Sequence, residues 1–222
     1  MIAEEIRIPA DDVSLNGDLT IPAGAAGVVL FAHGSGSSRH SPRNRMVAEE
    51  MNGDGIGTLL FDLLTTEEES VDIYTRHLRF DIALLARRLA AATLWLIERS
   101  DVSGIKIGYF GASTGGGAAL VAAAELGSEV AAVVSRGGRP DLAGRALPRV
   151  EAPTLLIVGE LDDAVIEMNE EALALLTCEK RLQIIPGATH LFEEPGTLQA
   201  VSRATIDWFN THFQTKHKTV TG

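Results

Sequence analysis

Short apolar runs rich in β-branched residues alternate along the chain with longer segments in which apolar positions recur every three or four residues. Continuous apolar runs between polar residues are typical of strands buried on both faces of a sheet. We therefore expect strands over residues 2–9, 13–21, 27–32, 58–61, 106–110, 130–135, 154–158 and 181–185. The short turn Ala10-Asp11-Asp12 joins the first two runs without a helix, so they predict an antiparallel pair.

The longer segments have the period of amphipathic helices. In one of them Leu78, Ile82, Leu85 and Leu89 are spaced by three or four residues. Helices are predicted over residues 42–52, 76–99, 114–126, 166–176 and 198–213. This alternation predicts an α/β fold with a mostly parallel central sheet, helices on both faces and an antiparallel strand near the N-terminus. We expect a single domain over residues 1–214, followed by a frayed tail over residues 215–222.

Composition and charge limit the kinds of partner that the protein is expected to bind. The chain has 222 residues, of which 45% are hydrophobic, and a formal net charge of −11. Nucleic-acid binding depends on basic residues that neutralise phosphates, so the acidic balance argues against it and against an anionic membrane surface. Cys178 is the only cysteine, and no apolar run is long enough to span a bilayer. The acidic start lacks the pattern of a signal peptide, so we expect a cytoplasmic protein.

A glycine-rich turn carries the candidate nucleophile. The sequence Gly111-Ala112-Ser113-Thr114-Gly115 follows a predicted strand and begins an alanine-rich predicted helix. This is the G-x-S-x-G pattern in the strand–turn–helix context that exposes a reactive serine hydroxyl. The alternative is a glycine-rich turn in which Ser113 only caps the helix. The context favours Ser113 as a nucleophile.

A serine nucleophile needs a base and a carboxylate that orients the base, and in one common arrangement both follow it in the chain. The strand predicted at 154–158 continues into GELDDAV, where Asp162 is our choice of acid and Glu160 and Asp163 are alternatives. The strand predicted at 181–185 continues into PGATHLF, which places His190 just past a strand end. His190 is therefore the predicted base, and a surface loop imidazole is the alternative.

The segment His33-Gly34-Ser35-Gly36 follows another buried strand and predicts an oxyanion-binding loop. One donor of such a site is the amide of the residue after the nucleophile, here Thr114. We expect the second to be the amide of Ser35, with that of Gly36 as the alternative. His33 is then a structural residue that fixes the loop. The loop matches neither common glycine-rich phosphate-binding pattern.

Two arginines follow the strand predicted at 130–135. Arg39 and Arg43 follow the predicted oxyanion loop. We hypothesise that one of these four arginines, Arg39, Arg43, Arg136 or Arg139, binds a carboxylate or phosphate of the substrate, because a guanidinium group favours paired contacts with oxyanions. Gly34 and Gly36 are grouped with them as candidate substrate-binding residues. The alternative is that these arginines pair with acidic residues of the chain, such as Asp141. The segments 63–79 and 137–150 are candidates for a small lid.

Several strings together resemble a known family. VVLFAHGSGSS, LLFDLLT, IGYFGASTG, SRGGRPDL, APTLLIVGELDDAV and PGATHLFEEPG are similar to the dienelactone hydrolase-like branch of the α/β-hydrolases. The resemblance implies an α/β-hydrolase fold, a triad of Ser113, Asp162 and His190, no metal and no organic cofactor. Some members of this branch are fused to a phosphoribosyltransferase domain. Dienelactone hydrolases proper use a cysteine nucleophile, so the serine at position 113 favours a carboxylesterase-like activity.

The sequence thus predicts a serine hydrolase that cleaves a small carboxylic ester through an acyl-enzyme. Two other functions stay open: an acyltransferase or thioesterase that uses the same triad, and a non-catalytic binding module on the same scaffold. The expected partner is a small-molecule ester, without nucleic acid or membrane. The sequence leaves the oligomeric state and the acyl group undetermined.

Overall fold

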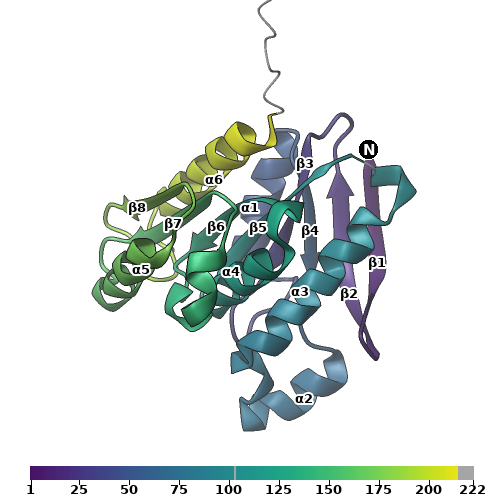
Figure 1. Cartoon of the computed structure of the whole chain (residues 1–222), viewed down its shortest axis with the longest axis horizontal. Helices are drawn as coiled ribbons and strands as arrows, with labels where there is room; N and C mark the ends of the chain where they lie inside the picture. The colour runs from purple at the N-terminus through teal and green to yellow at the C-terminus, as the bar shows by residue number, and fades with distance from the viewer. Residues whose placement is uncertain (103, 215–222) are drawn as a thin grey trace, which may run out of the picture.

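An eight-stranded sheet forms the centre of the molecule in the computed structural model, which describes residues 1–102 and 104–214 (Figure 1). Its order is β1-β2-β4-β3-β5-β6-β7-β8. β1 pairs with β2 and β2 with β4 in antiparallel orientation, and the other pairs are parallel. The strands are β1 (Ile2–Ala10), β2 (Val13–Ile21), β3 (Gly27–Ala32), β4 (Gly57–Phe61), β5 (Lys106–Ala112), β6 (Val130–Arg136), β7 (Thr154–Gly159) and β8 (Lys180–Ile185).

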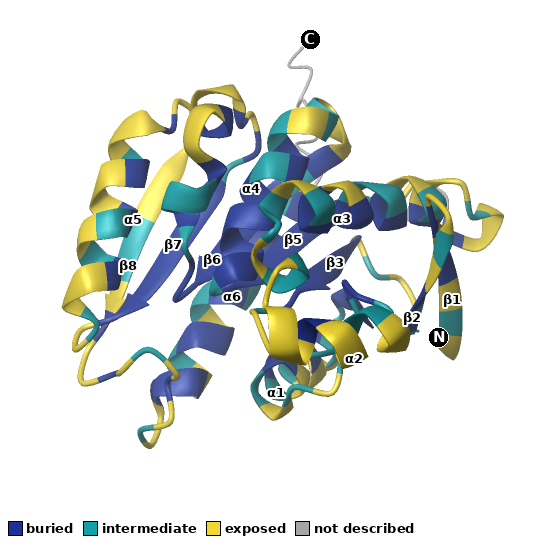
Figure 2. Ribbon diagram, turned by 90° about the horizontal axis from the view of Figure 1, so that it is seen from below, coloured by how far each residue is buried: buried dark blue, intermediate teal, exposed yellow. Residues whose placement is uncertain are grey.

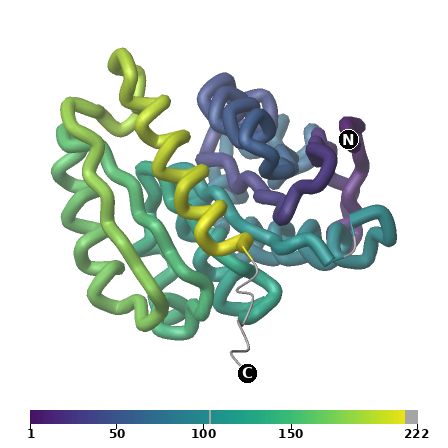
Figure 3. The backbone as a smooth tube through the Cα atoms, turned by 90° about the horizontal axis from the view of Figure 1, so that it is seen from above, coloured from purple at the N-terminus to yellow at the C-terminus, as the bar shows by residue number. Residues whose placement is uncertain are grey.

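Two helical layers cover the sheet. The α-helices are α1 (Pro42–Gly53), α2 (Thr66–Thr75), α3 (Ile82–Ile97), α4 (Thr114–Leu126), α5 (Asp163–Leu175) and α6 (Thr197–Phe213). Side chains of α3, α4 and α5 belong to one apolar core, and those of α1 and α6 belong to a second. α1 and α6 contact each other on one side of the sheet (Figure 3). α2 lies apart from both layers, at one end of the sheet (Figure 1).

Burial follows from the position of each strand. All residues of β3, β4 and β7 are buried, and their sequences are continuous apolar runs. β8 is an edge strand, and only its last residue is buried. Figure 2 shows this difference between the centre of the sheet and the β8 edge. The predicted α/β class, the parallel sheet and the antiparallel start are confirmed.

The predicted helix over residues 76–99 is wrong in its first part. α2 ends before Arg76, whose φ of 53° is left-handed, and a single 3₁₀ turn, η1 (Leu78–Phe80), follows. Asp81 then caps α3, because its side chain accepts a hydrogen bond from the amide of Leu84 at 3.0 Å. Leu78 still packs against the core, so the apolar spacing continues across a break in the helix.

A longer 3₁₀ segment, η4 (Pro140–Arg149), lies within the candidate lid segment 137–150. The predicted tail over 215–222 lies outside the described residues. Within the described part of the chain, none of the helices has the length and apolar character needed to cross a membrane.

Candidate active site

The turn between β5 and α4 holds Ser113 in a strained conformation. Its φ of 51° and ψ of −122° are unfavourable for a residue with a side chain. The flanking glycines permit the turn, since a Cβ atom on Gly111 would lie 2.5 Å from the carbonyl oxygen of Gly115. Strain of this kind is typical of a serine elbow that presents its hydroxyl group at the end of a sheet.

The end of β6 supports this turn through the backbone. The amide of Ser113 donates to the carbonyl oxygen of Arg136 at 3.2 Å, and the amide of Arg139 donates to the carbonyl oxygen of Ser113 at 3.0 Å. Ser113 is thus bonded on both sides to the segment that follows β6. The strain at this residue is sustained by tertiary hydrogen bonds.

Asp162 and His190 are brought together at the ends of β7 and β8. The Nδ1 atom of His190 lies 2.6 Å from Oδ2 of Asp162, within hydrogen-bond distance. The two alternative acids are placed differently. Glu160 accepts a hydrogen bond from the amide of Gly187 at 2.7 Å, and Asp163 is an exposed residue at the start of α5. Asp162 is the carboxylate that contacts the imidazole.

Ser113 and His190 line the same cavity, which has a volume of about 270 Å³. We name it the catalytic cavity. Its wall comes from the loop after β3, the start of α1, the ends of β5 and β6, and the loop after β8. The lining residues are Gly34, Ser35, Ser37, Ser41, Arg43, Asn44, Ala112, Ser113, Arg136, His190 and Leu191. Ser113, the imidazole of His190 and the predicted oxyanion loop therefore line one space.

The loop after β3 lies directly against Ser113. A Cβ atom on Gly34 would be 3.1 Å from Cβ of Ser113, so only glycine fits there without displacement. The amide of Ser35 donates to Oγ1 of Thr114 at 2.9 Å. Thr114 is the first residue of α4, and amides of a first helical turn have no partner within the helix. The predicted donors thus lie beside each other, with the amide of Ser35 bonded to the Thr114 side chain.

His33 fixes this loop, as expected from the sequence. Its Nε2 atom accepts a hydrogen bond from the amide of Leu63 at 3.0 Å, so Nδ1 carries the proton and donates to the carbonyl oxygen of Gly34 at 3.0 Å. Burial lowers the pKa of His33 below its ordinary value. A neutral, fully engaged imidazole at this position is structural.

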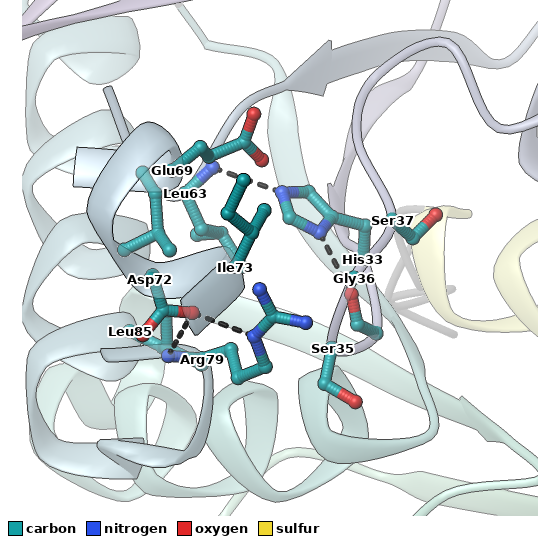
Figure 4. A pocket seen from close by; sticks show the side chains of 12 residues that line it. His33, Ser35, Gly36, Ser37, Leu63, Glu69, Asp72, Ile73, Arg79 and Leu85 are labelled. Carbon is teal, nitrogen blue, oxygen red and sulfur yellow. Dashed lines mark hydrogen bonds and ion pairs between the residues drawn. The ribbon is translucent and has the colours of Figure 1, made fainter. Parts of the chain in front are cut away.

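A second cavity of about 220 Å³ is also lined by residues of the loop after β3 (Figure 4). We name it the apolar cavity, because Leu63, Leu64, Ile73 and Leu85 line it beside an ion pair. In that pair Nε of Arg79 lies 2.6 Å from Oδ2 of Asp72. Gly34, Ser35 and Ser37 line both cavities, and α2 contributes to the wall of the apolar cavity.

The two candidate arginines at the end of β6 differ in their partners. Arg139 forms two hydrogen bonds with the carboxylate of Asp141, at 2.8 and 2.7 Å. It therefore agrees with the alternative expectation, in which the arginine pairs with an acidic residue of the chain. Arg136 is buried, lines the catalytic cavity and donates to Oδ1 of Asn44 at 3.3 Å. Its guanidinium carbon also lies 5.8 Å from the ring centre of Phe192.

Two supporting residues were missed by the sequence analysis. Gly137 has a φ of 50°, a left-handed conformation that favours glycine, and it lies against His190, whose carbonyl oxygen would be 3.3 Å from a Cβ atom there. The Gly-Gly pair after Arg136 was its only signal. Asn44 is a buried polar residue on α1 that contacts Arg136, and no motif marks it. Among the described residues, no group of three or more histidine, cysteine or acidic side chains is arranged to hold a metal ion.

The sheet order, the helical layers and the serine turn define an α/β-hydrolase fold. A family model described as "Dienelactone hydrolase family" matches residues 19–217, and the chain belongs to this family of hydrolases. The fold and family inferred by resemblance are therefore confirmed.

Individual relatives agree with this assignment. A crystal structure of a dienelactone hydrolase from Anabaena variabilis is 61% identical, with a TM-score of 0.94 over 96% of this chain and 99% of that chain. The structure of Est1E from Butyrivibrio proteoclasticus has a TM-score of 0.77 at 18% identity, over 94% of this chain and 98% of that one, and supports the fold alone.

Longer curated relatives carry a different name. Two Mycobacterium tuberculosis proteins named "Putative phosphoribosyl transferase" are 56% identical over 209 residues, which is 94% of this chain and 46% of theirs. The chain thus spans about half the length of these relatives.

Proposed function

We propose that this protein is a serine hydrolase that cleaves a small carboxylic ester through an acyl-enzyme intermediate. The observation that carries the proposal is the hydrogen bond of 2.6 Å between His190 and Asp162, in a cavity that also contains the strained Ser113. A carboxylate on Nδ1 leaves Nε2 of the imidazole as the acceptor for the serine proton.

The reaction has two halves. The Ser113 oxygen attacks the acyl carbon while His190 takes its proton, and Asp162 stabilises the imidazolium ion that forms. The amides of Thr114 and Ser35 donate to the oxyanion, the Ser35 amide in exchange for its hydrogen bond to Oγ1 of Thr114, and His190 returns the proton to the alcohol as it leaves. Water activated by the same imidazole then attacks the acyl-enzyme and releases the acid.

Labelling and kinetics test the proposal together. A fluorophosphonate probe is expected to label the wild-type protein at Ser113 and to leave Ser113→Ala unlabelled. On a panel of short-chain esters, Ser113→Ala should lose at least about 10⁴-fold in kcat. Ser128→Ala is the matched control, since Ser128 is exposed at the opposite end of the parallel strands, before β6. Undiminished hydrolysis by Ser113→Ala, or absence of probe labelling, would contradict the proposal.

Product analysis separates hydrolysis from acyl transfer. With a primary alcohol or thiol present, a hydrolase should release mainly the free acid, whereas a transferase should give mainly the new ester or thioester. The phosphoribosyl transferase name of the longer relatives supports no part of this proposal, because this chain accounts for less than half of their length.

A further inference from the structure

β8 is an exposed edge of the sheet, and alternate peptide groups along it have no strand to pair with. In a parallel pair, alternate residues of a strand turn both their N–H and C=O groups toward the neighbouring strand. The carbonyl oxygens of Glu179 and Ile185 accept hydrogen bonds of 2.8 and 3.0 Å from amides at and just past the two ends of β7. The residues between them that are out of this phase, Lys180, Leu182 and Ile184, therefore point their peptide groups away from the sheet.

The basic side chains of β8 leave this edge open. Lysine and arginine on an edge strand commonly prevent other strands from pairing with it. Here, however, Nζ of Lys180 donates to the carbonyl oxygen of Leu176 at 2.6 Å, and the guanidinium carbon of Arg181 lies 5.4 Å from the ring centre of Trp208. Both basic groups are thus held against the helical layers of their own chain.

The opposite edge of the sheet is built differently. β1, at the other end of the sheet (Figure 1), contains Pro9, which has no N–H group to donate. It also carries Glu4, whose carboxylate lies 2.6 Å from Nη2 of Arg99. Proline and charge on an edge strand are typical means of preventing strand addition. β8 contains no proline, so it is the edge of this sheet that suits the addition of another strand.

Charges of both signs border β8 on the side of α6. A groove of about 400 Å³ lies between β8 and one face of α6 that includes Ala200, Arg203, Ala204 and Asp207. We name it the edge groove. Arg203 and Asp207 are exposed, and within the described part of the chain their side chains form no ion pair. The small side chains of the two alanines leave room beside them.

Arg203 and Asp207 lie on either side of the middle of β8. The end of α6 lies beside the start of β8, and further along Arg181 contacts Trp208, so the two elements run in opposite directions. The chain rises about 1.5 Å per residue in a helix and about 3.3 Å per residue in a strand. The step from Trp208 back to Arg203 therefore covers about two strand residues, and the two charges flank the level of Leu182.

We propose that two copies of this chain pair through their β8 strands in antiparallel orientation, about a twofold axis at Leu182, and form a dimer with one continuous sheet. Leu182 then lies opposite Leu182 of the second copy, and Lys180 lies opposite Ile184. Each of these pairs exchanges two N–H···O=C hydrogen bonds. The same axis brings Arg203 of each copy toward Asp207 of the other, so the charges of the edge groove are paired reciprocally.

This interface is small. One strand and one face of a helix correspond to the lower end of specific interfaces, which bury about 1,200–2,000 Å² in total. We therefore expect a dimer that dissociates on dilution, with a Kd on the order of micromolar. The residues that line the edge groove are different from those that line the catalytic cavity, so the oligomeric state and the activity can be measured separately.

Sedimentation velocity between about 1 and 100 µM tests the dimer, because this range brackets the expected Kd. The mass should rise from 23.6 kDa toward twice that value. Ile184→Pro removes an outward-facing amide but none of the hydrogen bonds to β7, and it should stay monomeric at the highest concentration. Ile184→Val is the matched control and should dimerise like the wild type. A wild-type protein that is monomeric at every concentration would overturn the proposal.

Charge reversals on α6 locate the interface without any change to the strand. Asp207→Arg places two positive charges near each other across the axis and should raise the dimer Kd at least about tenfold. The further change Arg203→Asp restores opposite charges and should return the Kd close to the wild-type value. Arg87→Asp, at an exposed position of α3, is the control and should leave the Kd unchanged. A dimer that is unaffected by both Ile184→Pro and Asp207→Arg has a different interface and would refute this one.

Discussion

The hydroxyl group of Thr114 is hydrogen-bonded to one of the two amides that we propose as oxyanion donors. Thr114 supplies one donor through its own amide, and its Oγ1 atom accepts the hydrogen bond of the Ser35 amide at 2.9 Å. The same side chain therefore holds the loop after β3 at the start of α4. It fixes the distance between the two donors before a substrate binds.

Replacement of Thr114 by valine should lower kcat about tenfold, which corresponds to ~1.4 kcal/mol of transition-state stabilisation. The shape is kept, but the loop loses the acceptor that orients the Ser35 amide. Thr114→Ser retains the hydroxyl group and should stay close to the wild-type rate. Steady-state kinetics on a neutral ester provides the measurement. Equal rates for the valine and serine variants would show that this hydrogen bond does not position the donor.

His33 should make the stability of the protein sensitive to mild acid. Burial lowers its pKa in the folded state, so between the folded and unfolded pKa values the unfolded chain binds more protons. The contribution of neutral His33 to the free energy of unfolding is therefore fully present above the ordinary histidine pKa. It falls as the pH drops below that value, by at most about 1.4 kcal/mol per pH unit.

Urea unfolding at pH 7.5 and pH 5.0 measures this loss. His33→Gln should be less stable than the wild type at pH 7.5, because it loses the two loop hydrogen bonds, but it should lose less stability between the two pH values. An equal loss in both proteins would assign the acid sensitivity to other groups.

The sequence predicts the site residues that lie in recognisable motifs better than it predicts the residues that support them. Ser113 and His190 follow strand ends within recognisable strings, and the structure places both at one cavity. Asn44 and Gly137 have no such signal, because their roles depend on contacts between elements distant in the chain. Which of Arg136 and Arg139 pairs internally also depends on orientation, which a sequence does not specify.

At the scale of elements, α2 is joined to α3 by an ion pair between the buried Arg88 and the partly exposed Glu68. Glu68 and Thr65 form a capping box at the start of α2, and the same carboxylate pairs with Arg88 of α3. Arg88 also donates to the carbonyl oxygen of Leu63 at 2.7 Å, and this pairing lowers the pKa of Glu68. Because α2 contributes to the wall of the apolar cavity, this wall depends on the Glu68–Arg88 ion pair, whose residues do not line the cavity.

Glu68→Gln should lower the free energy of unfolding by about 3 kcal/mol, because it leaves the buried guanidinium group of Arg88 without an opposite charge. Glu67→Gln, on the exposed side of the same helical turn, is the control and should change stability by less than about 0.5 kcal/mol. Denaturant titration of the three proteins gives the comparison. A loss as small as that of the control would mean that the pair contributes little to the attachment of α2.

The error over residues 76–99 has a physical cause. The apolar spacing that predicts a helix depends on which side chains face the core, and a 3₁₀ turn keeps Leu78 on the core side. The capping side chains of Thr65 and Asp81 mark the true starts of α2 and α3. In this segment, capping residues therefore predict the ends of the helices better than apolar periodicity alone does.

For the whole molecule, the parallel sheet gathers distant segments at one edge. The carboxyl ends of β3, β5, β6, β7 and β8 carry the proposed oxyanion loop, Ser113, Arg136, Asp162 and His190 in that order. Strand alternation predicts such a sheet, and ligands on sheets of this type lie at that edge. The placement of β4 between β2 and β3, and the division of the site into two cavities, follow from long-range packing.

The order of the site residues along the chain affects when the site can form during biosynthesis. The serine turn is held by hydrogen bonds to the segment after β6, and its imidazole partner follows β8, an edge strand that pairs only with β7. A nascent chain that has emerged from the ribosome only as far as α4 carries an inert hydroxyl group. Under the proposed mechanism, esterase activity requires that β8 has joined the sheet, so the appearance of that activity would report the pairing of the last strand.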